Sequence, residues 1–180
     1  MRWYKLGYQR GDAFAPNDIG KLYQYGNGVA KNYAEAMRWY RIADERGVAA
    51  AANNIGTLYD HGFGVKQNFT EALIWYVKAM KNGSHAAANN LGILYQFGRG
   101  VPQDYVKALQ WYRFAADKGN AGAPYNIGRM YDEGWGVKQD WKEAQRWYEL
   151  AVERGHPVAV LQLGDLRLRL MRDDKESARK

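Results

Sequence analysis

A period of 36 residues runs through this chain and restricts its fold more than any other feature of the sequence. The recurring positions are the tryptophans Trp3, Trp39, Trp75, Trp111 and Trp147, the single glycines Gly20, Gly56, Gly92, Gly128 and Gly164, and the glycine pairs that begin at Gly26, Gly62, Gly98 and Gly134. A fixed period of about 20–50 residues is typical of proteins in which one small structural unit is stacked many times. The sequence therefore predicts an array of similar units.

The first half of each unit has the pattern of an amphipathic helix. In the second unit, Ala51, Ile55 and Leu58 fall at helical spacing and form one apolar face. Gly56 lies inside this helix, where glycine costs roughly 1 kcal/mol relative to alanine. We expect close approach of a partner helix to offset that cost. The helix should end at Gly62, because glycine readily adopts the positive φ that terminates a helix.

A second helix follows directly, and its start is well marked. The expected N-cap residues are Asn32, Asn68, Asp104 and Asp140. Glutamate stands three residues later at Glu35, Glu71 and Glu143, which predicts a capping box, whereas the third unit has Lys107 there. Ala36, Tyr40 and Ala43 then form the apolar stripe of this helix. Each unit is thus predicted to be a helical hairpin that buries its apolar face against its neighbours.

The glycine pairs have a second interpretation, as phosphate-binding loops. A dinucleotide-binding fingerprint needs a strand before it and a third glycine after it. Here a helix is predicted before Gly26, and Val-Ala-Lys follows Gly28. We therefore interpret the pairs as hairpin turns.

The residues shared by the units form the pattern Ala-x3-Ile/Leu-Gly-x-Leu/Met-Tyr-x2-Gly-x-Gly-Val-x2-Asn/Asp-x3-Ala-x2-Trp-Tyr-x2-Ala. This pattern resembles the Sel-one-like repeat family, which belongs to the tetratricopeptide-like group of helical hairpins. The resemblance implies an all-α fold, a right-handed α/α solenoid of stacked hairpins. It also implies a non-enzymatic protein–protein interaction scaffold or adaptor.

One solenoid domain is expected to cover residues 1–180. Its parts are a partial repeat represented by its second helix (1–12), four full repeats (13–48, 49–84, 85–120 and 121–156), and a C-terminal capping helix with a tail (157–180). A terminal unit needs a polar outer face, which we expect of this cap. The N-terminal segment lacks its first-helix partner, which fits either a truncated longer array or an exposed end that forms a homodimer with another copy.

Residues suited to catalysis or metal binding are few. The chain has no cysteine, its three histidines are His61, His85 and His156, and its two serines are Ser84 and Ser177. None of them has the spacing of a zinc site or a nucleophile motif. We expect no catalytic, metal or cofactor site. No signal peptide or transmembrane segment is predicted, so we expect a soluble chain, either whole or part of a longer protein, whose compartment stays open.

Tetratricopeptide-like proteins, which the units resemble, bind peptides or partner helices in a concave groove lined by first helices. The residues expected to project into that groove are Asn17, Lys21, Tyr25, Asn53, Asp60, His61, Asn89, Phe97, Tyr125 and Arg129. The asparagines form a ladder that could hold an extended peptide backbone or, alternatively, bond between neighbouring repeats. Lys21 and Arg129 could receive a peptide carboxylate, and the aromatic residues are of the kind enriched at binding hot spots.

Two alternative functions stay open from the sequence. The net charge of +7 could attract nucleic acid or an anionic membrane surface. Nucleic acid is not the expected partner, because Glu35, Glu71 and Glu149 interrupt the basic residues of the second helices. The near-identity of the units would also suit a designed array without a natural partner. Variation at the groove positions Asp60 and Gln96 favours a natural sequence.

Overall fold

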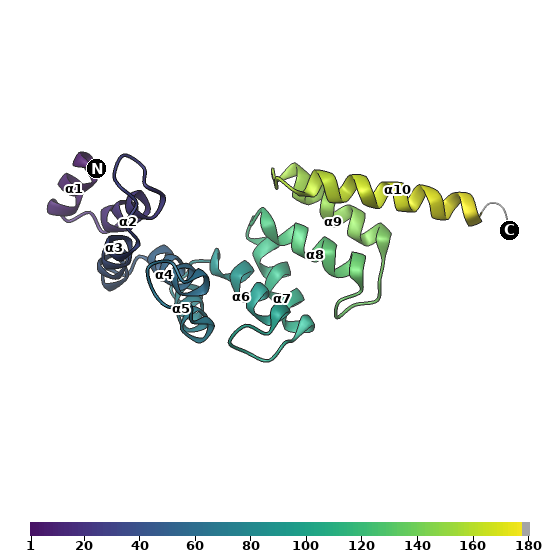
Figure 1. Ribbon diagram of the computed structural model, residues 1–180, viewed down its shortest axis with the longest axis horizontal. Coiled ribbons are helices and arrows are strands. Elements are labelled where there is room, and N and C mark those ends of the chain that lie inside the picture. Colours follow the sequence, from purple (N-terminus) through teal and green to yellow (C-terminus); the bar gives the residue numbers. More distant parts are fainter. Residues whose placement is uncertain (178–180) are drawn as a thin grey trace.

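The computed structural model describes residues 1–177, and every regular element in that range is a helix. In chain order the helices are α1 (Arg2–Gln9), α2 (Ala15–Tyr25), α3 (Tyr33–Glu45), α4 (Ala49–His61), α5 (Phe69–Lys81), α6 (Ala87–Phe97), α7 (Tyr105–Asp117), α8 (Gly122–Glu133), α9 (Trp141–Glu153) and α10 (Ala159–Ser177). They stack as hairpins along an arc, and α1 and α10 lie at opposite ends of it (Figure 1). The predicted all-α solenoid with a repeat of 36 residues is confirmed.

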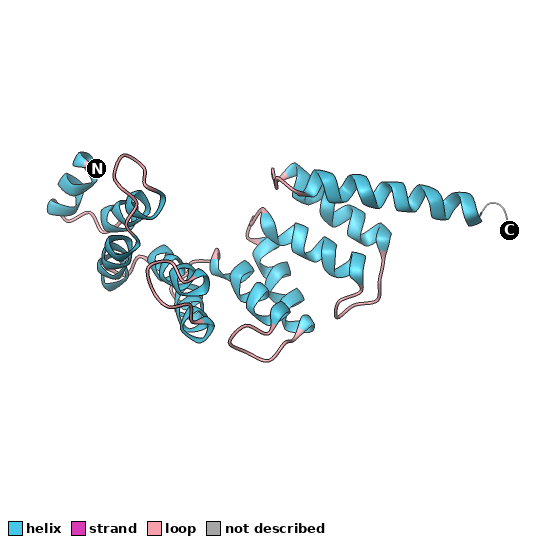
Figure 2. Ribbon diagram, in the orientation of Figure 1, coloured by secondary structure: helices cyan, strands magenta, loops and turns pink. Residues whose placement is uncertain are grey.

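The turns inside the hairpins form where the glycine pairs predicted them (Figure 2). Gly26, Gly62, Gly98 and Gly134 end the first helices with φ of 75°, 69°, 64° and 73°. The second glycine of each pair also has positive φ, and a Cβ on Gly64 would lie 2.5 Å from Cβ of Tyr33 in the preceding repeat. The glycine pair therefore serves both the turn and the packing of one hairpin on the next.

The predicted N-caps are confirmed, but the capping box is wrong. The backbone N–H groups of Glu35, Glu71, Lys107 and Glu143 donate to the cap side chains over 2.9–3.1 Å. The N–H of the cap residue Asn32, however, donates to the backbone carbonyl of Tyr23 at 2.9 Å rather than to Glu35. Since the preceding helix supplies that acceptor, the glutamate is dispensable, and the third repeat keeps the same geometry with Lys107.

The core is built around one tyrosine per full repeat. Tyr40, Tyr76, Tyr112 and Tyr148 are completely buried, and each lies against the in-helix glycine of its own hairpin. The predicted close approach at these glycines is confirmed, although the approaching group is the tyrosine ring rather than a helix backbone.

The two ends of the solenoid leave apolar side chains exposed. On α1, Trp3 is 78% exposed and Tyr4 is 41% exposed. Leu170 and Arg172 stand on α10 at the positions of the glycine pair, and this helix of 19 residues exposes Val160, Leu161, Leu168 and Met171. The exposed residues of α10 thus include apolar side chains beside charged ones such as Asp165 and Arg172, and residues 178–180 of the predicted tail lie outside the described residues.

Candidate functional site

The first helices α2, α4, α6 and α8 follow the inner side of the arc, and the second helices follow its outer side (Figure 1). The ten candidate groove residues on these first helices differ in exposure. Lys21, Tyr25, His61 and Phe97 are exposed, Asn53, Asn89, Tyr125 and Arg129 are half-buried, and Asn17 and Asp60 are buried. Asn17 and Asp60 are only 4% and 7% exposed, so neither side chain is open to a partner. The other eight residues form what is called the candidate surface below.

The asparagine ladder links neighbouring repeats. The Nδ2 group of Asn54 donates to Oδ1 of Asn17 at 2.9 Å, and Asn90 donates in the same way to Asn53 at 3.2 Å. A third bond of 3.0 Å joins Asn126 to Asn89. Each bond uses only the oxygen of the accepting amide. Among the side chains described for residues 1–173, the Nδ2 groups of Asn53 and Asn89 have no acceptor and stay available to a partner.

Asp60 belongs to a second recurring interaction, which holds each hairpin together. The hydroxyl of Tyr76 donates to Oδ2 of Asp60 at 3.3 Å. The equivalent pairs are Tyr40 with Gln24, Tyr112 with Gln96, and Tyr148 with Asp132. Burial raises the pKa of the Tyr76 hydroxyl above its usual value, so the group remains a donor at neutral pH. These amide and carboxylate groups therefore have structural partners inside the hairpin.

One recurring position of the turns, missed at the sequence level, lies beside candidate groove residues: Phe63 contacts His61, Arg99 contacts Phe97, and Trp135 contacts Arg129. Phe63 stacks on Tyr33 of the preceding repeat, with ring centroids 4.9 Å apart and planes 7° from parallel. Trp135 stacks in the same way on Tyr105 at 6.1 Å. The third member is Arg99, whose guanidinium carbon lies 5.1 Å from the ring centroid of Phe97. Each of the three directly follows the first glycine of its turn, and this recurring position is the sequence pattern from which the contacts could have been predicted.

Lys21, Arg99 and Arg129 differ in their acidic partners. Lys21 forms an ion pair with Asp18 at 3.2 Å, whereas neither Arg99 nor Arg129 forms an ion pair with the side chains described for residues 1–173. Arg129 instead lies 5.0 Å above the ring of Trp135. The repeats containing α4 and α6 lie between Lys21 on α2 and Arg129 on α8.

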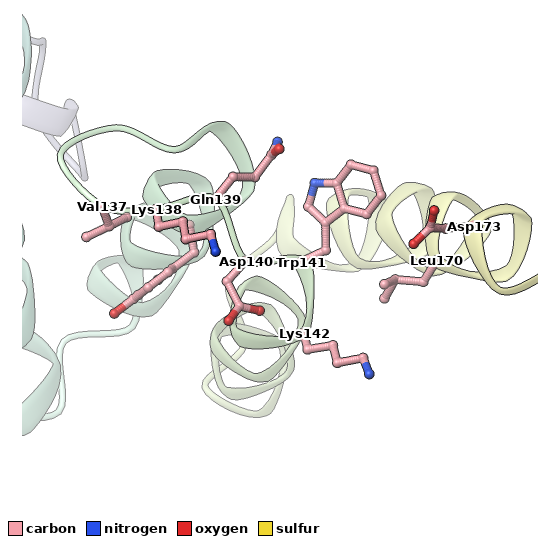
Figure 3. Close-up of a pocket in the computed structure, with 9 residues that line it drawn as sticks. Val137, Lys138, Gln139, Asp140, Trp141, Lys142, Leu170 and Asp173 are labelled. Atoms are coloured by element: carbon pink, nitrogen blue, oxygen red, sulfur yellow. The ribbon is translucent and has the colours of Figure 1, made fainter. Parts of the chain in front are cut away.

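Two cavities lie at turns, and two smaller ones lie on α5, beside Ile74 and Val77, and on α1. One of about 700 Å³ is lined by Tyr131, residues 137–142, Leu170 and Asp173 (Figure 3). Another of about 710 Å³ lies at the corresponding turn of the second repeat, beside Tyr59 and residues 65–70. Their recurrence indicates that they arise from the geometry of the turn. No cluster of three or more His, Cys, Asp or Glu suited to a metal ion occurs in the described part of the chain.

The fold and the repeated contacts define a solenoid of tetratricopeptide-like helical hairpins. The Sel1 repeat family matches residues 3–48, 49–84, 85–120 and 122–156, and the chain belongs to this family. Its members are in general protein–protein interaction scaffolds and are typically non-catalytic. The resemblance noted in the sequence is thereby confirmed. Comparison with curated proteins gives no significant match.

Solved structures with similar sequences share this fold. A Sel1 repeat protein from Oxalobacter formigenes is 34% identical, with a TM-score of 0.82 over 90% of this chain and 64% of its own. A protective antigen of uropathogenic Escherichia coli is 36% identical, with a TM-score of 0.80 over 93% of this chain and 36% of its own. An immunity protein of Pseudomonas aeruginosa is 26% identical and covers 87% of this chain, with a TM-score of 0.65. The chain thus spans less than two thirds of the length of these relatives.

No helix among residues 1–177 combines the length and the apolar character needed to cross a membrane.

Proposed function

We infer that the chain is a non-catalytic scaffold that binds an extended segment of a partner protein along its concave face. The observation that carries this proposal is the row of exposed aromatic side chains on successive first helices. Tyr25 is 62% exposed and Phe97 is 49% exposed, and His61 lies between them on α4. Large aromatic groups left in water on a rigid framework are typical of binding hot spots.

Polar groups on the same face suit a peptide backbone. The free Nδ2 groups of Asn53 and Asn89 are equivalent positions in adjacent repeats. Such donors can bond the carbonyl groups of an extended chain, which has no internal hydrogen bonds to satisfy them. Arg99 and Arg129 would favour acidic side chains in that partner, because neither has an ionic partner among the described residues.

The charge of the outer helices supports this proposal over binding of an anionic polymer. Arg38, Lys107 and Arg146 each form an ion pair with an acidic residue three positions earlier, at 3.0–3.3 Å. Lys78 pairs with Asp44 of the preceding repeat at 2.6 Å. Neutralised side chains of this kind do not form the continuous basic stripe that nucleic acid binding requires.

Site-specific photo-crosslinking in lysate of the source cells would test the assignment of the face. A photoreactive phenylalanine analogue would replace Phe97 on the concave side or Ile74 on α5, on the outer side. The two native residues are similarly apolar and exposed, at 49% and 54%. We expect one defined protein adduct from position 97 and none from position 74.

An Arg99→Ala, Arg129→Ala double variant should reduce the adduct at position 97 while the helical circular-dichroism spectrum is unchanged. Crosslinks only from position 74 would place binding on the outer face and contradict the proposal. Crosslinks to nucleic acid, with a yield that falls steeply as salt increases, would instead support the anionic-polymer alternative.

A further inference from the structure

Each end of the solenoid carries one half of a contact that is complete inside every full repeat. In those repeats a tyrosine of the second helix covers the glycine of the first helix, and a Cβ on that glycine would lie 2.5–2.7 Å from the ring. Gly164 on α10 occupies the glycine position, yet nothing lies within 4 Å of its Cβ position. Tyr4 on α1 occupies the tyrosine position and is 41% exposed, whereas its equivalents are completely buried.

We propose that α1 of one copy docks on α10 of another copy, so that Tyr4 covers Gly164 and completes a hairpin between the two chains. This inference is independent of the proposed function, because it uses the ends of the solenoid and not its concave face.

The surface around Gly164 is more apolar than the equivalent surface of the full repeats. Leu161 replaces the asparagine of the inter-repeat ladder, and Leu168 replaces the Gln or Asp that accepts from the buried tyrosine. Both leucines are largely exposed, at 68% and 55%. With Val160 and Met171 they lie on one side of α10 at helical spacing, as an apolar stripe that the side chains of residues 1–173 leave exposed.

Two of the basic groups of α10 form ion pairs with the preceding helices. Arg167 is paired with Glu149 of α9 at 2.7 Å, and Arg169 is paired with Asp132 of α8 at 2.8 Å. Asp165 stands where Thr57 lies 3.5 Å from the hydroxyl of Tyr76. Asp165 can therefore accept from the hydroxyl of Tyr4, and it lies opposite a helix that carries Arg2 and Lys5.

In the same docked arrangement, Trp3 would contact the second helix of the last repeat, as its equivalents do inside the solenoid. Trp111, its equivalent, packs on the core clusters of two successive repeats together with Met80 of the preceding second helix. Val152 of α9 holds the position of Met80 in the last repeat and is partly buried. Docking of α1 on α10 would bring Trp3, which is 78% exposed, against Val152.

The contact joins two different surfaces at opposite ends of the molecule (Figure 1). Because each added copy presents a new free end, such a heterologous contact extends into an open series and does not close at a dimer. The proposal therefore differs from a symmetric homodimer through α1 in a measurable way.

Sedimentation velocity of the full chain over increasing concentration would test this. We expect the weight-average mass to rise continuously beyond that of a dimer. Tyr4→Ala and Gly164→Val should each remain monomeric, while the control Ala50→Val, at an exposed position of α4, should associate as the parent does. A one-to-one mixture of Tyr4→Ala and Gly164→Val should form a dimer and grow no further, because each variant retains the end that the other lacks.

A parent chain that stays monomeric, or that stops growing at the dimer, would overturn the proposal. So would undiminished association of Gly164→Val, loss of association in Ala50→Val, or a mixture of the two end variants that stays monomeric. Circular dichroism of each variant confirms that the fold is retained, since Gly164 has open space at its Cβ position.

Discussion

The ring of Tyr112 lies so close to Gly92 that a Cβ on the glycine would stand 2.5 Å from Cε1 of the tyrosine. Glycine inside a helix costs roughly 1 kcal/mol relative to alanine, and here the missing side chain admits a completely buried aromatic ring. Burial of a large apolar side chain contributes about 1.5–3 kcal/mol, which exceeds that cost. The same relationship recurs at Gly20, Gly56 and Gly128.

Substitution of this glycine should therefore have opposite effects at two equivalent positions. Gly92→Val should destabilise the protein by about 1–3 kcal/mol, because the ring of Tyr112 must move. Gly164→Ala should stabilise α10 by about 0.5–1 kcal/mol, because no ring lies over that position. Urea unfolding of both variants beside the parent measures the two changes. Equal effects of the two substitutions would show that contact with the tyrosine ring is not the reason why glycine is required at position 92.

The buried pair of Tyr112 and Gln96 should behave as a coupled unit. The tyrosine hydroxyl donates to Oε1 of Gln96 at 2.5 Å, and Gln96 is only 3% exposed. Tyr112→Phe alone should cost about 1–3 kcal/mol, because it leaves a buried acceptor without a donor. The double variant Tyr112→Phe, Gln96→Leu should recover most of that loss. A double-mutant cycle by chemical denaturation measures the coupling, and simple additivity would contradict it.

The N-cap side chains should stabilise their helices independently of the glutamates that follow. Asn68→Ala removes the acceptor of the Glu71 N–H, a bond of 3.1 Å, and should cost about 1 kcal/mol. Glu71→Ala should have little effect, because the N–H of Asn68 already donates to the carbonyl of Tyr59 at 2.9 Å. Thermal unfolding compares the two variants. A larger loss of stability for Glu71→Ala than for Asn68→Ala would contradict this and support a capping box.

The cap at Asp104 should lose its effect in acid, unlike the cap at Asn68. The backbone N–H of Lys107 donates to the Asp104 carboxylate and lowers its pKa, and the Lys107 ammonium adds to the effect. A carboxyl with a lower pKa in the folded state stabilises that state above its unfolded pKa of about 3.9. This contribution disappears as the pH falls through the folded pKa.

The difference in unfolding free energy between the parent and Asp104→Asn should therefore be constant from about pH 5 to 7 and shrink below about pH 4. The substitution Asn68→Ala provides the control, since the change it causes in unfolding free energy should not depend on pH. Unfolding titrations at a series of pH values measure both, and a difference for Asp104→Asn that grows in acid would contradict the assignment.

The repeat made much of the local structure predictable. The turn at Gly62 and the cap at Asn68 depend on residues close in sequence, and both were predicted correctly. The other half of the capping box failed for a non-local reason. The acceptor for the N–H of Asn68 is the backbone carbonyl of Tyr59 on the preceding helix. Because every residue has a backbone carbonyl, the residue types do not indicate which carbonyl accepts this bond.

The candidate surface shows the same division. Tyr25 and Phe97 are exposed where helical spacing placed them. Spacing alone could not separate Asp60 from His61, which are neighbours in the chain but differ in burial. Asp60 turns toward Tyr76, and only the packing of α5 against α4 reveals that the carboxylate is in use.

The sequence by itself determined the class of fold, because a 36-residue period of helices, turns and apolar stripes allows little except stacked hairpins. Only the tertiary structure decided the function of individual polar residues. Asn54 bonds Asn17 in the neighbouring repeat, and Gln96 bonds a tyrosine of the partner helix. The reason is physical: propensity and periodicity act within one segment, whereas a side chain's partner depends on which segments pack beside it. The exposure of Tyr4 and of Gly164 likewise follows from which neighbours each end lacks.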